Sequence, residues 1–189
     1  MGVAVTSLGG AQVSAQEVYK ADPTHTELRF GWNHSGMSNQ SGEFHKVDGT
    51  LVLDRDDLTA STISVKIDIN SVSTGVPMLD EHLKEPDFFD AASLPEATFE
   101  STQITLTGEK TAEVTGDLTI RDVTLPITLS TTLTFDDEHP QGGVFAEYAG
   151  HWVAFSATGT IEYPKAFGVG PFPVGEMELV INTELQIQE

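Results

Sequence analysis

The sequence predicts an all-β protein, a single extended antiparallel β-barrel of about eight strands with a short helical insertion around residues 77–90. From residue 27 onward, apolar and polar residues alternate with period two, which is typical of strands with one dry and one wet face. Helical periodicity is nearly absent, so the chain offers no set of helices to cover a sheet. Its 189 residues are the length of one domain.

Eight segments carry the strand pattern. In the first strand, Leu28, Phe30, Trp32 and His34 share one face. The other seven are predicted over residues 47–53, 63–69, 99–106, 113–120, 127–135, 144–161 and 177–187. Phe99 and Ile104 cannot share a face without an extra residue, so we predict a β-bulge near residues 101–103.

The connections between these strands are polar and rich in turn residues. Residues 107–110 and 136–143 are predicted to be hairpin connections. Only residues 71–95 form a long interruption, in which Pro77 is placed to begin a short helix. Long insertions in compact domains are usually functional, so this segment is predicted to be a lid or plug. Closure of about eight strands leaves room inside for side chains or for one slender ligand.

The composition excludes several classes of function. With 29 acidic residues against 9 basic ones, the formal net charge of −20 argues against nucleic-acid binding and favours solubility. The chain has no cysteine, which excludes disulfides, thiolate nucleophiles and iron–sulfur sites. No apolar run reaches the length of a transmembrane helix, so we expect a protein that is not integral to a membrane but exchanges its ligand with one.

Residues 1–17 are predicted to be a leader remnant or linker outside the fold, and residues 18–189 to be the barrel domain. The first stretch ends in Val13-Ser14-Ala15, which resembles the end of a signal peptide, although the positively charged start is missing. This predicts a periplasmic or secreted protein.

No residue is nominated for catalysis or for a metal site. The six histidines show no pair at the short spacing of metal ligands. The chain has no nucleophile elbow, Walker loop or His-Glu-x-x-His motif. We therefore expect a binding protein and not an enzyme, with no required cofactor. His34 shares a face with Phe30 and Trp32, where it is either a satisfied core group or a partner for a ligand head group.

Several motifs, in order along the chain, resemble the YceI-like family. They include Asp80-Glu81-His82-Leu83, Asp87-Phe88-Phe89-Asp90 and the stretches at 19–30, 42–44, 71–75, 95–101 and 114–121, together with His34. The resemblance covers nearly the whole chain after the leader. It implies a lipocalin-like barrel, exported to the periplasm, that carries or stores polyisoprenoid chains such as isoprenoid quinones or prenyl phosphates.

Two positions depart from the family's pattern. Leu79 stands where relatives commonly have arginine, and residues 163–168 lack the arginine and aspartate of an Arg-x-Asp-Phe-Gly run. A buried phosphate without cations is costly, so a neutral isoprenoid quinone such as ubiquinone is the predicted ligand.

The resulting hypothesis is a quinone carrier that serves electron transfer. The prenyl tail is expected among Phe30, Trp32, Ile67, Phe99, Leu118, Leu129, Trp152 and Phe155. The head group is expected near His34, His82, Phe88 and Phe89. Two alternatives stay open: a stress-response or interaction module whose barrel is packed and holds no stable ligand, and a polyprenyl-phosphate binder. A homodimer and a neighbouring redox domain also stay open as partners.

Overall fold

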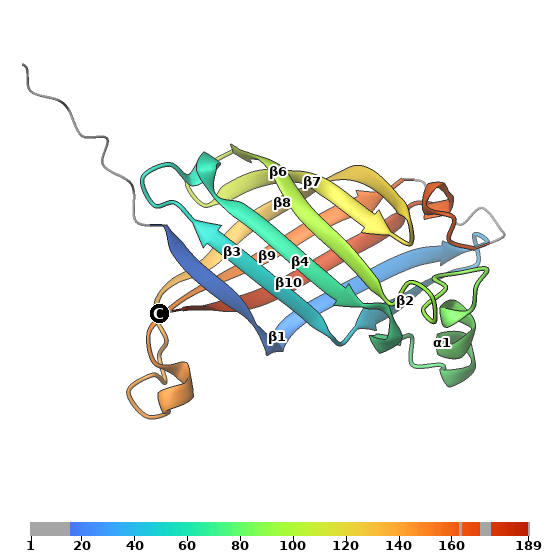
Figure 1. Ribbon diagram of the computed structural model, residues 1–189, viewed down its shortest axis with the longest axis horizontal. Helices are drawn as coiled ribbons and strands as arrows, with labels where there is room; N and C mark the ends of the chain where they lie inside the picture. Colours follow the sequence, from blue (N-terminus) through green and yellow to red (C-terminus); the bar gives the residue numbers. More distant parts are fainter. Residues whose placement is uncertain (1–15, 163, 171–174, 189) are drawn as a thin grey trace, which may run out of the picture.

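The protein is an eight-stranded antiparallel barrel, as the period-two pattern predicts. The computed structural model describes residues 16–162, 164–170 and 175–188. The strands follow one another around the wall, and pairing between the first and the last closes it (Figure 1). The wall consists of β1 (Glu17–His34), β3 (Val47–Leu53), β4 (Thr62–Asp68), β6 (Glu96–Leu106), β7 (Thr111–Ile120), β8 (Val123–Glu138), β9 (His151–Ile161) and β10 (Met177–Ile187).

Two further short strands extend the wall. β2 (Ser38–Phe44) forms a hairpin with the second half of β1, while β3 pairs with the first residues of β1. β5 (Val72–Ser73) pairs with the end of β2. Neither strand was predicted, because the polar sequence of β2 lacks apolar alternation and β5 has only two residues.

Local details of several strands agree with the sequence pattern. β3 and β10 have the predicted bounds. The register of β6 against β7 shifts between Ser101 and Gln103, which confirms the predicted bulge. The extra residue lets Phe99 and Ile104 both face inward despite their odd spacing.

Other bounds were wrong. The strand predicted over residues 144–161 begins only at His151, because residues 139–150 leave the wall as a connection with a short 3₁₀ turn, η3 (Ala146–Tyr148). β8 continues to Glu138, three residues into the predicted turn. Glu17, assigned to the leader, is the first residue of β1 and pairs with Leu53. Residues 1–15 lie outside the described residues.

The predicted helical insertion covers one end of the barrel, which we call the α1 end (Figure 1). α1 (Pro77–Lys84) begins at the predicted proline, and the Asp80 carboxylate accepts hydrogen bonds from the backbone nitrogen and hydroxyl of Thr74, both at 2.6 Å. No helix among the described residues is long and apolar enough to cross a membrane.

Buried apolar side chains fill the α1 end. Ile69, Leu83, Phe89 and Phe167 are each at most 9% exposed. Arg121, in the turn between β7 and β8, donates from Nη1 to the carbonyl oxygens of Phe88 at 2.9 Å and of Gly168 at 2.5 Å. The insertion and the segment after β9 are thus fastened to one turn of the barrel.

Candidate functional site

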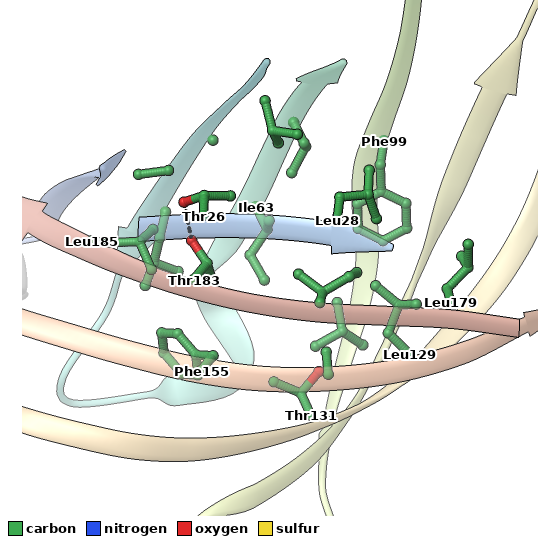
Figure 2. A pocket seen from close by; sticks show the side chains of 18 of the residues that line it. Thr26, Leu28, Ile63, Phe99, Leu129, Thr131, Phe155, Leu179, Thr183 and Leu185 are labelled. Atoms are coloured by element: carbon green, nitrogen blue, oxygen red, sulfur yellow. Dashed lines mark hydrogen bonds between the residues drawn. The ribbon is translucent and has the colours of Figure 1, made fainter. Parts of the chain in front are cut away.

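The barrel encloses an apolar cavity of about 530 Å³. This volume lies within the roughly 300–1,000 Å³ that ligand pockets usually occupy. Each of the eight wall strands contributes inward-facing side chains, because alternate residues of a strand point to the same face. β4, for example, turns Ile63 (Figure 2), Val65 and Ile67 inward.

Six of the eight residues predicted to hold an apolar tail line this cavity: Phe30, Ile67, Phe99, Leu118, Leu129 and Phe155. Trp32 and Trp152 do not. Trp32 stacks on Phe30 with a centroid separation of 5.8 Å, at the α1 end of β1. Trp152 is three residues from Phe155, so the pleat of β9 turns it outward, where its indole nitrogen donates to the carbonyl of Tyr148 at 3.1 Å.

Of the four residues predicted near a head group, only Phe89 lines the cavity. His34 is exposed, since it lies beyond Trp32, the last residue of β1 that pairs with β10. His82 is also exposed, and its ring contacts Phe88 edge-on with centroids 4.7 Å apart. These two histidines therefore belong to the outside of the α1 end. Phe88 is partly buried against the core but does not line the cavity.

The two ends of the cavity differ in polarity. At the α1 end the lining is apolar and includes Phe44, Ile69, Phe89, Ile120 and Met177. Within the described part of the chain, the charged residues of the lining all lie toward the opposite end of the strands: Arg55, Glu109, Lys110 and Asp136.

This opposite end, which we call the open end, brings the cavity to the surface. Leu58 in η1 (Leu58–Ala60) and Leu106 at the end of β6 line the cavity yet are 39% and 49% exposed. The tip of the β6–β7 hairpin, from Glu109 to Thr111, is also both lining and exposed. We therefore place the entrance between η1 and this hairpin.

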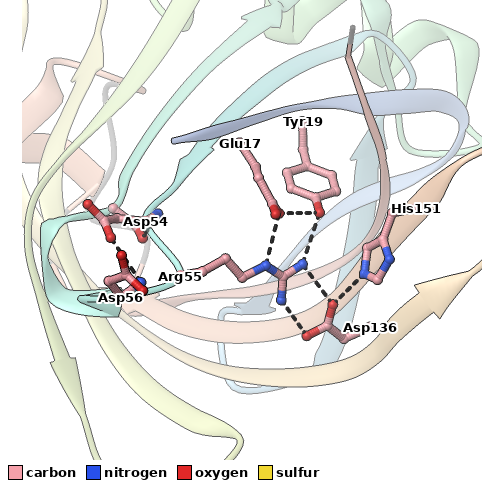
Figure 3. Close-up of polar contacts among 8 residues, drawn as sticks. Glu17, Tyr19, Asp54, Arg55, Asp56, Asp136 and His151 are labelled. Atoms are coloured by element: carbon pink, nitrogen blue, oxygen red, sulfur yellow. Dashed lines mark hydrogen bonds and ion pairs between the residues drawn. The ribbon is translucent and has the colours of Figure 1, made fainter. Parts of the chain in front are cut away.

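A network of polar side chains lies beside the entrance, and we call it the Arg55 cluster (Figure 3). Arg55 donates from Nη1 and Nη2 to the two carboxylate oxygens of Asp136, at 2.8 and 3.0 Å. It also donates from Nε to Glu17 at 2.9 Å and from Nη2 to the Tyr19 hydroxyl at 3.0 Å. His151 completes the cluster, with Nε2 at 2.7 Å from Asp136 Oδ1.

The contact between Arg55 and Asp136 crosses the barrel. Arg55 follows β3 by two residues, and Asp136 lies near the end of β8. In the closed strand order, β3 and β8 are separated by four steps through β4, β6 and β7, and by four through β1, β10 and β9. The ion pair therefore joins opposite sides of the wall at the open end.

The contacts within the cluster fix its charges. The hydrogen bond from Arg55, helped by the one to His151, holds the pKa of Asp136 below its usual value of 3.8. Burial and the hydrogen bond to Glu17 raise the pKa of Tyr19 to about 12. Burial acts to raise the pKa of Glu17, but hydrogen bonds from Tyr19 and Arg55 outweigh it and lower that pKa. At neutral pH the tyrosine is neutral and both carboxylates are charged.

Sequence patterns did not find this cluster. Arg55 and Asp136 are 81 residues apart, each in a run of acidic residues that reads as a solvated turn. Their contact arises only because the barrel closes. Among the described residues, no group of three or more metal-ligating side chains converges, and no buried side-chain nitrogen or oxygen lacks a hydrogen-bond partner.

Comparison with known proteins finds similarity along nearly the whole chain. The pattern of the YceI-like domain family matches residues 19–188. A "UPF0312 protein" of Pseudomonas savastanoi pv. phaseolicola is 37% identical over 186 residues, covering 97% of this chain and 92% of its own. A protein of the same name from Pseudomonas aeruginosa is 33% identical over 192 residues, covering 96% of this chain and 95% of its own.

Solved structures share the fold. Burkholderia cenocepacia BcnA superposes with a TM-score of 0.74 at 22% identity, over 87% of this chain and 98% of its own. The Campylobacter jejuni YCEI protein superposes with a TM-score of 0.71 at 24% identity, over 83% of this chain and 90% of its own. A domain from Saccharophagus degradans, named a polyisoprenoid binding domain, superposes with a TM-score of 0.65 at 15% identity, over 90% of this chain and 98% of its own.

Proposed function

We propose that this chain, which belongs to the YceI-like domain family, binds a long-chain polyisoprenoid lipid inside its barrel. The observation that carries the proposal is the cavity of about 530 Å³, which apolar side chains from every wall strand line. The cavity speaks against the alternative of a packed barrel without a ligand, because the protein's own side chains do not fill the interior.

The chemistry of the lining favours an aliphatic chain. Burial contributes roughly 25 cal/mol for each Å² of apolar surface removed from water, or about 0.8 kcal/mol for each CH₂ group. Six threonine and serine residues are spread thinly along the lining, and two of them, Thr26 and Thr183, already hydrogen-bond to each other at 2.8 Å. Tail length should therefore dominate affinity. The name of the Saccharophagus degradans domain supports the same ligand class.

Within that class we propose a neutral isoprenoid quinone such as ubiquinone. A buried prenyl phosphate would need cations that are free to pair with it. Arg55 is already held by two carboxylates, Lys110 is exposed at the tip of the β6–β7 hairpin, and Leu79 packs against the apolar core. In the segment 163–168, which lacks the arginine and aspartate that relatives commonly have, residue 163 lies outside the described residues.

The role that follows is a carrier or store that hands a quinone between membranes or redox partners in the periplasm or outside the cell. The largely apolar lining of the cavity supports binding of the lipid and does not call for a chemical step on it. Cell fractionation of the native host tests the location, and recovery in the cytoplasmic fraction would overturn that part.

Lipid extraction tests the binding function. Protein purified from its native host should release a prenyl lipid into organic solvent, identified by mass spectrometry. The emptied protein should then take up ubiquinone with higher affinity as its prenyl tail is lengthened. If extraction yields no prenyl lipid and added quinone is not taken up, the proposal fails. Recovery of a polyprenyl phosphate instead would keep the lipid-binding function and reject the quinone.

A further inference from the structure

We propose that the Arg55 cluster is the head-group site of the bound lipid, and that it selects a neutral head group that can accept or donate a hydrogen bond. The inference rests on the proposed binding of a prenyl lipid. It reverses the orientation predicted from the sequence, which placed the head group at the α1 end near His34 and His82.

The first argument is the polarity of the cavity. A prenyl lipid has one polar end, and the transfer of an unpaired polar group to an apolar environment is costly. At the α1 end the described lining offers Ile69, Phe89 and Met177, whereas Arg55 and Asp136 line the open end. A lipid that enters tail-first places its tail against the buried α1 end and leaves its head group beside the Arg55 cluster.

The second argument is the charge of the cluster. At neutral pH, one guanidinium faces the carboxylates of Glu17 and Asp136, so these three groups sum to −1 when His151 is neutral. At the entrance, the charges of Glu109 and Lys110 cancel. A phosphate would add negative charge to a site that already has an excess of it, whereas a neutral head group meets no such repulsion.

The third argument is the set of hydrogen bonds that the cluster can still form. A guanidinium has five N–H groups, and four contacts occupy those of Arg55: two to Asp136, one to Glu17 and one to Tyr19. Nη1 makes a single one of these contacts, so its second N–H can donate to a quinone carbonyl. Asp136 Oδ2 accepts one bond, from Arg55, and has capacity for a quinol hydroxyl.

A donor and an acceptor thus stand side by side where the cavity meets the entrance. A quinone needs the donor and its reduced form needs the acceptor, while neither form changes the charge of the site. The geometry therefore predicts that the oxidised and reduced ligands bind with affinities within about tenfold of each other.

Variants of the two ends test the orientation. The double variant Arg55→Gln/Asp136→Asn removes one positive and one negative charge and keeps polar groups at both positions. Three ligands with similar prenyl tails are compared by equilibrium binding: a ubiquinone, a polyprenyl monophosphate, and squalene, which has no head group. His82→Gln at the α1 end is the matched control. Circular dichroism and thermal unfolding establish that each variant is folded.

The expected result is a loss of about tenfold in ubiquinone affinity for the double variant, from the lost charge-assisted hydrogen bond. Squalene affinity should not change, and His82→Gln should bind all three ligands as the unmodified protein does. If squalene and ubiquinone both bind but the double variant keeps the original preference, or His82→Gln alters it, the inference is overturned. If none of the prenyl compounds binds, the proposed function itself fails.

A second measurement does not depend on the stability of the variants. A ubiquinone analogue with a photoreactive group on its ring is irradiated in complex with the unmodified protein, and the labelled peptides are identified. Labels on residues 53–61, 106–112 or 133–138 support the orientation. Labels on residues 77–90 overturn it.

Discussion

At the scale of single residues, two phenylalanines of the cavity wall depend on glycines for their position. Phe30 faces Gly42 across β1 and β2, and a Cβ atom added at Gly42 would lie 2.6 Å from Phe30 Cζ. A Cβ at Gly116 would likewise lie 2.4 Å from Phe99 Cζ. Both rings line the cavity, so the missing side chains let the rings lie against the wall and leave the lumen free.

Gly42→Ala should therefore push the Phe30 ring into the cavity. We expect a loss of about 1–3 kcal/mol in the free energy of unfolding, as for other overpacked cores, and several-fold weaker binding of a prenyl ligand. Denaturant unfolding and ligand titration measure the two effects. Gly31→Ala is the control, because a Cβ there makes only an ordinary contact of 3.5 Å with the Gln40 carbonyl. Equal effects of the two substitutions would contradict the prediction.

Asp136 should make the stability depend on pH in the acid range. Its pKa is lowered in the folded protein by Arg55 and His151, so its contribution is complete above its usual pKa of 3.8 and is lost as the pH falls through the lowered value. Asp136→Asn should cost about 1–3 kcal/mol at pH 7, and the difference from the unmodified protein should shrink between pH 4 and 2.

Unfolding curves recorded across that pH range measure this difference. Asp48→Asn serves as the control, since its carboxylate is 69% exposed and 3.5 Å from Lys20. A difference between Asp136→Asn and the unmodified protein that stays constant down to pH 2 would show that Asp136 does not titrate as described.

At the scale of elements, the alternation of apolar and polar residues predicted the strands and bulges that depend on near neighbours in sequence. It located β3, β10 and the bulge in β6, since in each the inward face is marked by large apolar residues. Trp152 was wrongly grouped with Phe155 by hydrophobicity alone, because the odd spacing of these two residues puts them on opposite faces of β9. Alternation could not find the Arg55 cluster, because Arg55 and Asp136 meet only across the closed barrel.

The insertion that contains α1 should limit the length of chain that the cavity accepts. Phe89 is 6% exposed and lines the cavity. Its ring contacts that of Phe44 edge-on, with the ring centroids 5.9 Å apart. Phe89→Ala should cost about 3–5 kcal/mol of stability and shift the ligand preference toward longer prenyl chains. Competition among ubiquinones of different tail length measures the shift. Met78→Ala on the same insertion, at an 83% exposed position, should change neither property. An unchanged length preference in Phe89→Ala would place the end of the tail elsewhere.

At the scale of the whole molecule, charge repulsion opposes folding. The net charge of −20 is spread over a closed wall whose outward residues are largely acidic or polar. Salt screens such repulsion, with a Debye length that falls from about 10 Å at 0.1 M to about 3 Å at 1 M. We expect the Tm to rise with NaCl concentration, by roughly 2–4 °C for each kcal/mol of repulsion removed.

Thermal unfolding in NaCl and in KCl should give the same rise, because screening depends on ionic strength. Sucrose at matched osmolality separates this effect from general solvent exclusion. A Tm that does not change with either salt would show that the acidic residues are too far apart to repel one another appreciably.

The barrel has a covered α1 end and an open end, and this asymmetry limits how a ligand can enter and leave the cavity. In the proposed function, a lipid that enters tail-first between η1 and the β6–β7 hairpin leaves by the same passage, head group first. The protein cannot then exchange lipid with a donor membrane and an acceptor membrane at the same time. It must release its lipid to the acceptor before it can bind another from the donor. Exchange between donor and acceptor vesicles should accordingly follow ping-pong kinetics, with parallel lines in double-reciprocal plots. Intersecting lines would require a second passage through the molecule.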